Sequence, residues 1–127
     1  MPRPEPTVRL RGKLWVELGG KNALTEAGAD LLEQIEATGS LSQAAKNLRF
    51  AYRRAWLLID AMNKNWPQPL VTTATGGKRG GGASLTELGT AVLAAYRHMQ
   101  LNLEHFLDTE AEPFKLAVRA SRVHRHK

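Results

Sequence analysis

The chain has 127 residues, 43% of them hydrophobic and 24% charged, which suits one folded domain and does not suit a disordered chain. It contains no cysteine, so disulfide frameworks, zinc fingers, iron–sulfur sites and thiol nucleophiles are excluded. The sequence has neither an apolar run long enough to span a membrane nor a secretory signal at its start, so we expect a cytoplasmic protein with no membrane partner.

The net charge is +6, and the excess of lysine and arginine is largest over residues 49–65 and 111–127. Clustered positive charge of this kind is typical of nucleic-acid binders. A basic soluble protein that binds no nucleic acid accounts for the charge equally well, so the charge alone leaves both interpretations open.

The first third of the chain predicts an arm, a strand and a helix. Residues 1–7 are rich in proline and predict a flexible arm. Partial alternation of apolar and basic residues over 8–16 predicts a half-exposed strand, followed by a turn at 19–22. A helix is expected over 26–38, with Thr25 as its N-cap and Gly39 after its end, and with an apolar stripe of Leu31, Leu32 and Ile35.

Two more helices are expected in quick succession. Ser40 and Gln43 have the spacing of a capping box, and the helix that they start has an apolar face made by Leu41, Ala44, Ala45 and Leu48. A third helix is expected over 51–64, ended by the prolines that follow Trp66. Its inner face consists of Ala55, Ile59 and Met62, and its outward residues are Arg53, Arg54, Leu57, Asp60 and Lys64.

A hairpin and a long helix complete the predicted elements. Residues 70–75 and 83–85 are β-prone, and the glycine-rich segment 76–82 predicts a long basic tip between them. Thr86 caps a fourth helix with a sustained stripe of Leu88, Val92, Tyr96, Met99, Leu103 and Phe106. The stripe predicts a homodimer interface, with an ordinary intramolecular core as the alternative. Residues 108–127 predict a basic tail that is loose or forms a short frayed helix.

This order of elements predicts a winged helix-turn-helix of the α+β class, mostly α, with a glycine-rich β-hairpin wing and a long C-terminal dimerisation helix. The major groove of B-DNA admits one α-helix, so the third helix would read bases while the second braces it. The glycine-rich wing would approach phosphates closely. We expect the DNA-binding and dimerisation domain to cover residues 8–107.

Three tracts resemble known regulators. Residues 39–46, Gly-Ser-Leu-Ser-Gln-Ala-Ala-Lys, resemble the start of the helix-turn-helix in LysR-type regulators. Residues 52–56, Tyr-Arg-Arg-Ala-Trp, with Ile59 and Met62-Asn63 further on, resemble the reading helix of the ModE family of bacterial molybdate-responsive regulators. Residues 74–83, Ala-Thr-Gly-Gly-Lys-Arg-Gly-Gly-Gly-Ala, resemble that family's wing. The resemblance implies a sequence-specific, double-stranded DNA-binding transcriptional regulator of molybdate transport or molybdenum-enzyme genes.

The residues expected at DNA lie in the second helix, the third helix and the wing. Arg53 and Arg54 are the foremost candidates, because a bidentate arginine on guanine discriminates bases by about 1–3 kcal/mol. Phosphate contact without sequence information is the alternative for each, and Trp56 is expected to pack against the second helix. The full set is Ser42, Gln43, Lys46, Tyr52, Arg53, Arg54, Thr75, Lys78 and Arg79.

The sequence departs from the family's pattern in three respects. It reaches Lys127 without the Ser-Ala-Arg-Asn motif of the family's molybdate-binding domains, so we expect only the DNA-binding domain here and no direct molybdate sensing, with a separate effector-sensing protein as a candidate partner. Ala51 stands where a capping hydroxyl is expected. Arg54 and Leu57 replace smaller or polar residues, which predicts an altered operator.

The sequence predicts neither an enzyme nor a cofactor site. The loop ending in Lys78 has Thr72 and Arg79 where a P-loop requires Gly and Ser or Thr, and Leu85 stands where a dinucleotide motif requires Gly. His98 and His105 are expected to be solvated or packed rather than to bind a metal. Two alternatives to a specific regulator stay open: a weakly specific architectural DNA-binding protein, and an oxyanion-binding or accessory protein.

Overall fold

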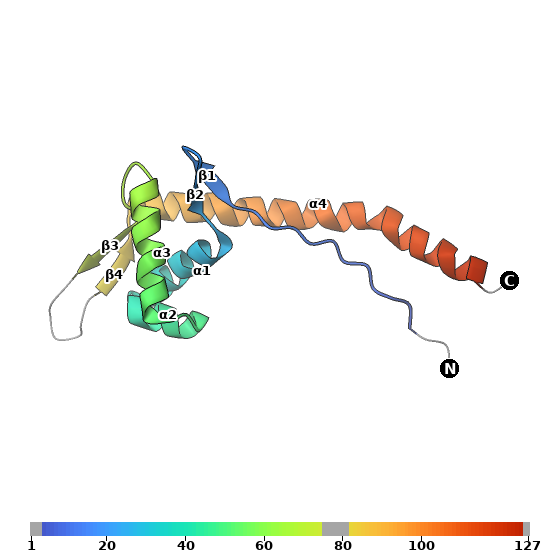
Figure 1. The fold of residues 1–127 in the computed structure, drawn as a ribbon, viewed down its shortest axis with the longest axis horizontal. Coiled ribbons are helices and arrows are strands. Elements are labelled where there is room, and N and C mark those ends of the chain that lie inside the picture. The colour runs from blue at the N-terminus through green and yellow to red at the C-terminus, as the bar shows by residue number, and fades with distance from the viewer. Residues whose placement is uncertain (1–3, 75–81, 126–127) are drawn as a thin grey trace. The chain divides into compact units, whose positions relative to one another are not determined.

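The computed structural model describes residues 4–74 and 82–125 (Figure 1). Residues Lys13–Arg97 form one compact unit, and residues 4–12 with 98–125 form another. Within the described ranges no helix is both long and apolar enough to cross a membrane. The elements in chain order are β1 (Val16–Leu18), β2 (Lys21–Leu24), α1 (Glu26–Thr38), α2 (Leu41–Leu48), α3 (Tyr52–Asn65), β3 (Val71–Ala74), β4 (Gly82–Leu85) and α4 (Glu87–Arg125).

The unit formed by Lys13–Arg97 has the architecture of a winged helix-turn-helix. Helices α1, α2 and α3 follow one another closely, and the antiparallel hairpin β3–β4 comes next, with its strands paired from Val71 and Leu85 to Ala74 and Gly82. A second antiparallel hairpin, β1–β2, precedes the helices. The expected fold class, α+β with mostly helix and a β-hairpin wing, is confirmed.

Capping side chains set the helix ends, as the sequence predicted. Gly28 donates its backbone N–H to Thr25 Oγ1 (3.2 Å), and Gln43 donates its backbone N–H to Ser40 Oγ (3.1 Å). Gly39 ends α1 in the left-handed region with φ 69°. The capping box at α2 is only half formed, because the Ser40 backbone N–H donates to Thr38 Oγ1 (3.2 Å) and not to the Gln43 side chain, which donates to Asn47.

The core of this unit lies among α1, α2, α3 and the hairpins, which pack against one another. The predicted inner faces of the three helices are confirmed, apart from Leu48, which is only half-buried. Adjacent alanines on α2 let α1 approach closely. The buried residues of these faces are Leu31, Leu32, Ile35, Leu41, Ala44, Ala45, Ala55, Ile59 and Met62.

The first part of α4 completes this core. Leu93 and Tyr96 are 5% and 2% exposed, and the Tyr96 hydroxyl donates to Leu14 O (2.8 Å). Burial raises the pKa of Tyr96 above its ordinary value. Arg97 donates to Asp30 (2.9 Å) and Glu33 (3.0 Å) on α1, so α4 is tied to the helical core by polar as well as apolar contacts.

The predicted strand over 8–16 is wrong in its extent. Residues 4–15 have no regular secondary structure, and β1 begins only at Val16. The predicted turn is present, since Gly19 and Gly20 have φ values of 61° and 79° between β1 and β2. Val8 and Leu10 are half-buried while their basic neighbours are exposed, because an extended chain lying beside a helix alternates its side chains as a strand does.

Helix α4 extends further than the sequence predicted. It continues to Arg125, where a loose tail or a short frayed helix was expected. Pro113 lies inside it and removes one backbone donor. The C-terminal part of α4 packs against the extended residues 8–10. Ala111 on α4 is only 5% exposed and lies in the same surface region as Val8 and Leu10.

Asn63 on α3 fixes the start of the wing. Its Oδ1 accepts from the backbone N–H of Leu70 (2.9 Å) and of Val71 (3.2 Å), and its Nδ2 donates to Val71 O (3.0 Å). One side chain therefore satisfies three backbone groups where β3 begins. Gly89 at the start of α4 lies so close to the Leu70 carbonyl that no Cβ would fit there.

We expect Asn63→Ala to lower the free energy of unfolding by about 2–4 kcal/mol, because it leaves three backbone groups without a partner beside the core. Urea denaturation measures this change. Asn65→Ala is the matched control, since Asn65 donates one exposed hydrogen bond to Asn22 O and its loss should cost about 1 kcal/mol or less. Equal losses in the two variants would contradict the anchoring role of Asn63.

Candidate nucleic-acid interface

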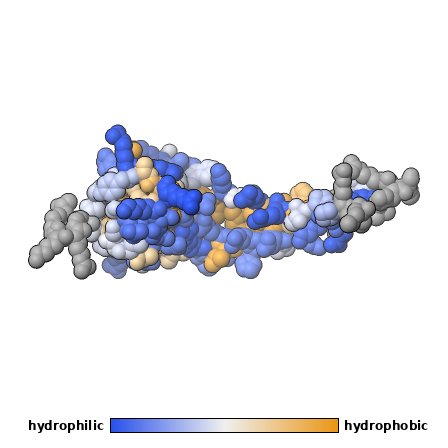
Figure 2. All heavy atoms as spheres, turned by 90° about the horizontal axis from the view of Figure 1, so that it is seen from below, coloured by the Kyte–Doolittle hydropathy of each residue, from blue (hydrophilic) through white to orange (hydrophobic). Residues whose placement is uncertain are grey.

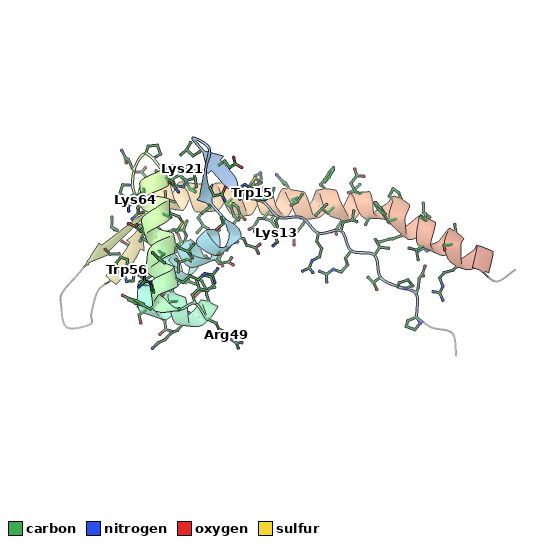
Figure 3. The ribbon with its side chains drawn as sticks, viewed as in Figure 1. Lys13, Trp15, Lys21, Arg49, Trp56 and Lys64 are labelled. Atoms are coloured by element: carbon green, nitrogen blue, oxygen red, sulfur yellow. The ribbon has the colours of Figure 1, made fainter. Side chains whose placement is uncertain are left out.

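The outward side of α3 presents large polar, aromatic and cationic side chains. Ala55, Ile59 and Met62 face the core, which turns the remaining residues of the helix outward. Most of the first two turns is exposed, including Tyr52 at 53% and the two arginines that follow it. Side chains along this helix are drawn in Figure 3. The arrangement is that of a helix free to enter a groove with its N-terminal half.

Ring contacts orient the side chains at this end of α3. The Arg54 guanidinium carbon lies 4.2 Å from the centroid of the Phe50 ring, a cation–π contact across the turn. The Tyr52 and Trp56 rings meet edge to face, with centroids 6.3 Å apart and an interplanar angle of 83°. Trp56, expected against α2, therefore has a ring partner on its own helix. It is 39% exposed and part of the outer surface.

Arg53 differs from Arg54 in having no such contact. Its side chain is exposed and forms no hydrogen bond, ion pair or ring contact with any residue that the structure describes. Its guanidinium is thus available to an external ligand, whereas Arg54 is held against Phe50.

Three predicted contact residues lie on the exposed side of α2: Ser42, Gln43 and Lys46. A chain of amides orients the second of them. Gln43 Nε2 donates to Asn47 Oδ1 (2.9 Å), and Asn47 Nδ2 donates to Gln34 Oε1 (2.8 Å) on α1. Asn47 and Gln34 were missed from the sequence, and only the four-residue spacing of Gln43 and Asn47 could have indicated the first contact.

The remaining predicted contacts, Thr75, Lys78 and Arg79, lie outside the described residues. The strands that carry the tip are described. Thr72 and Ser84 share a hydroxyl hydrogen bond of 3.1 Å across the hairpin, and Ala83 donates to Gly39 O (3.0 Å). The base of the wing is thereby joined to the end of α1 as well as to α3.

The stripe predicted for dimerisation divides into residues of different burial. Tyr96 is part of the intramolecular core, and Leu88, Val92, Met99 and Leu103 are half-buried. Phe106 is 58% exposed. Figure 2 shows apolar side chains reaching the surface among polar ones, and the exposed large ones on α4 are Leu101, Phe106, Phe114 and Leu116.

The polar partners of α4 side chains lie on α1 as well as on α4 itself. Partial burial alone would lower the pKa of Arg97, but hydrogen bonds and charge from Asp30 and Glu33 outweigh it and hold that pKa above its ordinary value. His98 Nε2 lies 3.2 Å from Asn102 Nδ2. Within the described residues no group of three His, Asp or Glu side chains is placed to hold a metal ion.

No family model matches the chain. The molybdenum transport protein ModE of Azotobacter vinelandii is 41% identical over 90 residues, which are 71% of this chain and 33% of that protein. The DNA-binding transcriptional dual regulator ModE of Escherichia coli strain K12 is 46% identical over 66 residues, 52% of this chain and 25% of that protein. The matched part of this chain is thus similar to a corresponding part of these ModE proteins, and it has a winged-helix fold.

The chain spans about a third or less of the length of these curated ModE relatives. Among solved structures, the multiple antibiotic resistance repressor MarR matches with a TM-score of 0.55 and 18% identity, covering 80% of this chain and 75% of that chain. The likeness to MarR supports the fold. The likeness to ModE agrees with the family that the sequence motifs indicated.

The N-terminus of α3 lacks a side-chain cap, as the sequence predicted at Ala51. Ala51 has the extended backbone of an N-cap residue, φ −60° and ψ 141°. We therefore expect Ala51→Ser to raise the free energy of unfolding by about 0.5–1 kcal/mol, because its hydroxyl can accept from a free N–H of the first turn. Urea denaturation measures the change.

Ala61→Ser is the matched control for this cap. Ala61 is exposed in the interior of the same helix, where serine should lower the free energy of unfolding by a few tenths of a kcal/mol. If both serine variants shifted stability in the same direction, the first turn of α3 would not be short of a cap.

Proposed function

We propose that this chain is a sequence-specific DNA-binding regulator of transcription that acts as a homodimer in the cytoplasm. The observation that carries the proposal is the N-terminal half of α3, which presents Arg53 and Arg54 on an outward face while its other face is fixed in the core. Relatives named as transcriptional regulators support it. The proposal is a binding function and not a catalytic one.

In the proposed complex, α3 enters the major groove and α2 lies across the backbone. Arg53, which has no partner among the described residues, reads a guanine edge with its two parallel N–H donors. Arg54 keeps its stack on Phe50 and contacts a neighbouring base or phosphate from that fixed position. The wing, with Thr75, Lys78 and Arg79, follows the flanking backbone.

The residues of α2 have a separate role in this proposal. Ser42 and Lys46 bind phosphates, and Gln43 does so from the orientation that Asn47 and Gln34 impose on its amide. Tyr52 lies at the start of α3 with its ring held by Trp56, so that its hydroxyl reaches the backbone.

We also propose that two chains associate through the apolar residues of α4 outside the core, above all Leu103 and Phe106. A dimer of this kind places two reading helices on a pseudo-palindromic site, with half-sites about 34 Å apart. Residues 8–107 would form the DNA-binding and dimerisation domain, with 108–127 as a basic extension.

The regulated genes in this proposal are those of molybdate transport or of molybdenum enzymes, in keeping with the relative named as a molybdenum transport protein. Effector sensing would reside in a separate protein. Co-purification of a second chain with this one, in the presence and absence of molybdate, tests that part of the proposal.

Selection of duplexes from a random library at about 150 mM salt tests the function directly. We expect an enriched palindrome, whose binding is weakened about tenfold or more by Arg53→Ala and by Arg54→Ala, with relaxed base preference in at least one of them. Lys78→Ala is the phosphate control, because it should weaken binding to all duplexes equally. The same selection with molybdate shows whether this chain responds to the anion.

Retention of all duplexes with similar affinity would favour the architectural alternative over a specific regulator. Absence of any retention would contradict DNA binding and favour the oxyanion-binding alternative. Wild-type operator affinity in both arginine variants would show that α3 does not lie in the groove as proposed.

The dimer predicts that Phe106→Glu weakens self-association at least tenfold, because it places a charge in the apolar contact. Sedimentation equilibrium measures the association constant. His105→Glu is the matched control, since His105 is the exposed neighbour on α4 and receives the same carboxylate. If both variants remained as associated as the unmodified chain, the interface would lie elsewhere.

A further inference from the structure

Arg49 has a backbone conformation that is unfavourable for arginine. It follows α2 with φ 60° and ψ 34°, in the left-handed region, and donates its backbone N–H to Lys46 O (3.1 Å). In the described part of the chain it is the one residue other than glycine with positive φ. Glycine adopts this conformation at helix ends without steric cost, whereas an arginine Cβ crowds its own backbone.

The Arg49 side chain makes no contact within the described fold that would offset this cost. It is exposed and has no hydrogen bond, ion pair or ring contact with a described residue. A positive charge at a helix C-terminus is favourable, but Lys46 already supplies one in the last turn of α2. Arg53 and Arg54 lie four and five residues further along, so Arg49 adds to a cluster of like charges.

Arg49 lies where its positive charge could contact a ligand bound to α3. It lies in the short turn that joins α2 to α3, next to the end of α3 that the proposed function places in the major groove. In Figure 3 the labelled side chain projects outward at the end of α2, and the hairpin β3–β4 lies on the other side of α3. A DNA duplex that contacts both the hairpin β3–β4 and α3 would therefore extend past this turn.

We propose that Arg49 binds a backbone phosphate of duplex DNA, on the side of the reading helix opposite the wing. A guanidinium binds phosphate through two parallel N–H donors, which suits an exposed arginine on a short, well-fixed turn. The inference rests on the proposed function and adds to it a non-specific contact that holds α3 in the groove from its second side.

Arg49→Gly separates this role from a structural one, because the two predict opposite changes in stability. Glycine relieves the backbone strain, so the midpoint of thermal unfolding should stay equal or rise by up to about 5 °C. Affinity for duplexes of any sequence should fall about tenfold. The slope of log K against log salt should become less steep by about 0.9 per chain, or about 1.8 per dimer.

Arg49→Asn repeats the test with a side chain that tolerates the left-handed region and carries no charge. Lys64→Gln is the matched control for charge, since Lys64 is exposed near the C-terminal end of α3, roughly 18 Å along the helix from Tyr52. It should leave the salt slope unchanged.

An unchanged salt slope in both Arg49 variants would overturn the inference while leaving the proposed function in place. A lower unfolding midpoint that accompanies the loss of affinity would also overturn it, because Arg49 would then act through the fold. A slope that Lys64→Gln changes as much as Arg49→Gly would show a general charge effect. If the unmodified chain retained no duplex, the proposed function would fail, and this inference with it.

Discussion

The arrangement of this domain depends on the three hydrogen bonds that Asn63 makes to the start of β3. Strand β3 begins just after the prolines that follow α3, where the Leu70 carbonyl accepts from the Thr86 N–H but the N–H groups of Leu70 and Val71 and the Val71 carbonyl need partners from elsewhere. The Asn63 amide supplies those partners from α3 itself, and the missing Cβ of Gly89 lets α4 begin against the same residue. Because the anchor belongs to the helix that the proposed function places in the groove, α3 and the base of the wing meet a ligand as one body.

The turn between α2 and α3 is stabilised less well than the start of β3. Its features each reduce stability: Arg49 is in the left-handed region, α3 starts at Ala51 without a side-chain cap, and the cations 49, 53 and 54 lie close in sequence. The core beneath the turn is well packed, with Ala44, Ala45 and Ala55 at 2% exposure or less. The features that reduce stability are therefore confined to the surface that would contact DNA in the proposed function. Phosphates bound there would relieve the repulsion among the three cations.

Features encoded by neighbouring residues could be predicted from the sequence, and features that depend on distant partners could not. The caps at Thr25, Ser40 and Thr86 and the inner faces of three helices follow from local spacing. The bonds from Asn63 and the amide chain from Gln43 to Gln34 join different elements, so no single pattern indicates them. The strand predicted over 8–16 failed because an extended chain beside a helix has the same two-residue period as a strand.

Helix α4 shows why a continuous apolar stripe did not distinguish its buried residues from its exposed ones. Its period is unbroken, yet Tyr96 is buried and, with the neighbouring Arg97, ties the helix to Leu14, Asp30 and Glu33, while Leu103 is half-buried and Phe106 is exposed. The stripe thus changes from intramolecular core to exposed surface between Tyr96 and Phe106, about three turns apart, and hydrophobic spacing cannot mark where that happens. In the proposed dimer this separation has a consequence: substitutions at Phe106 alter association without removing a contact of the domain core, so folding and assembly are stabilised by different residues of one helix.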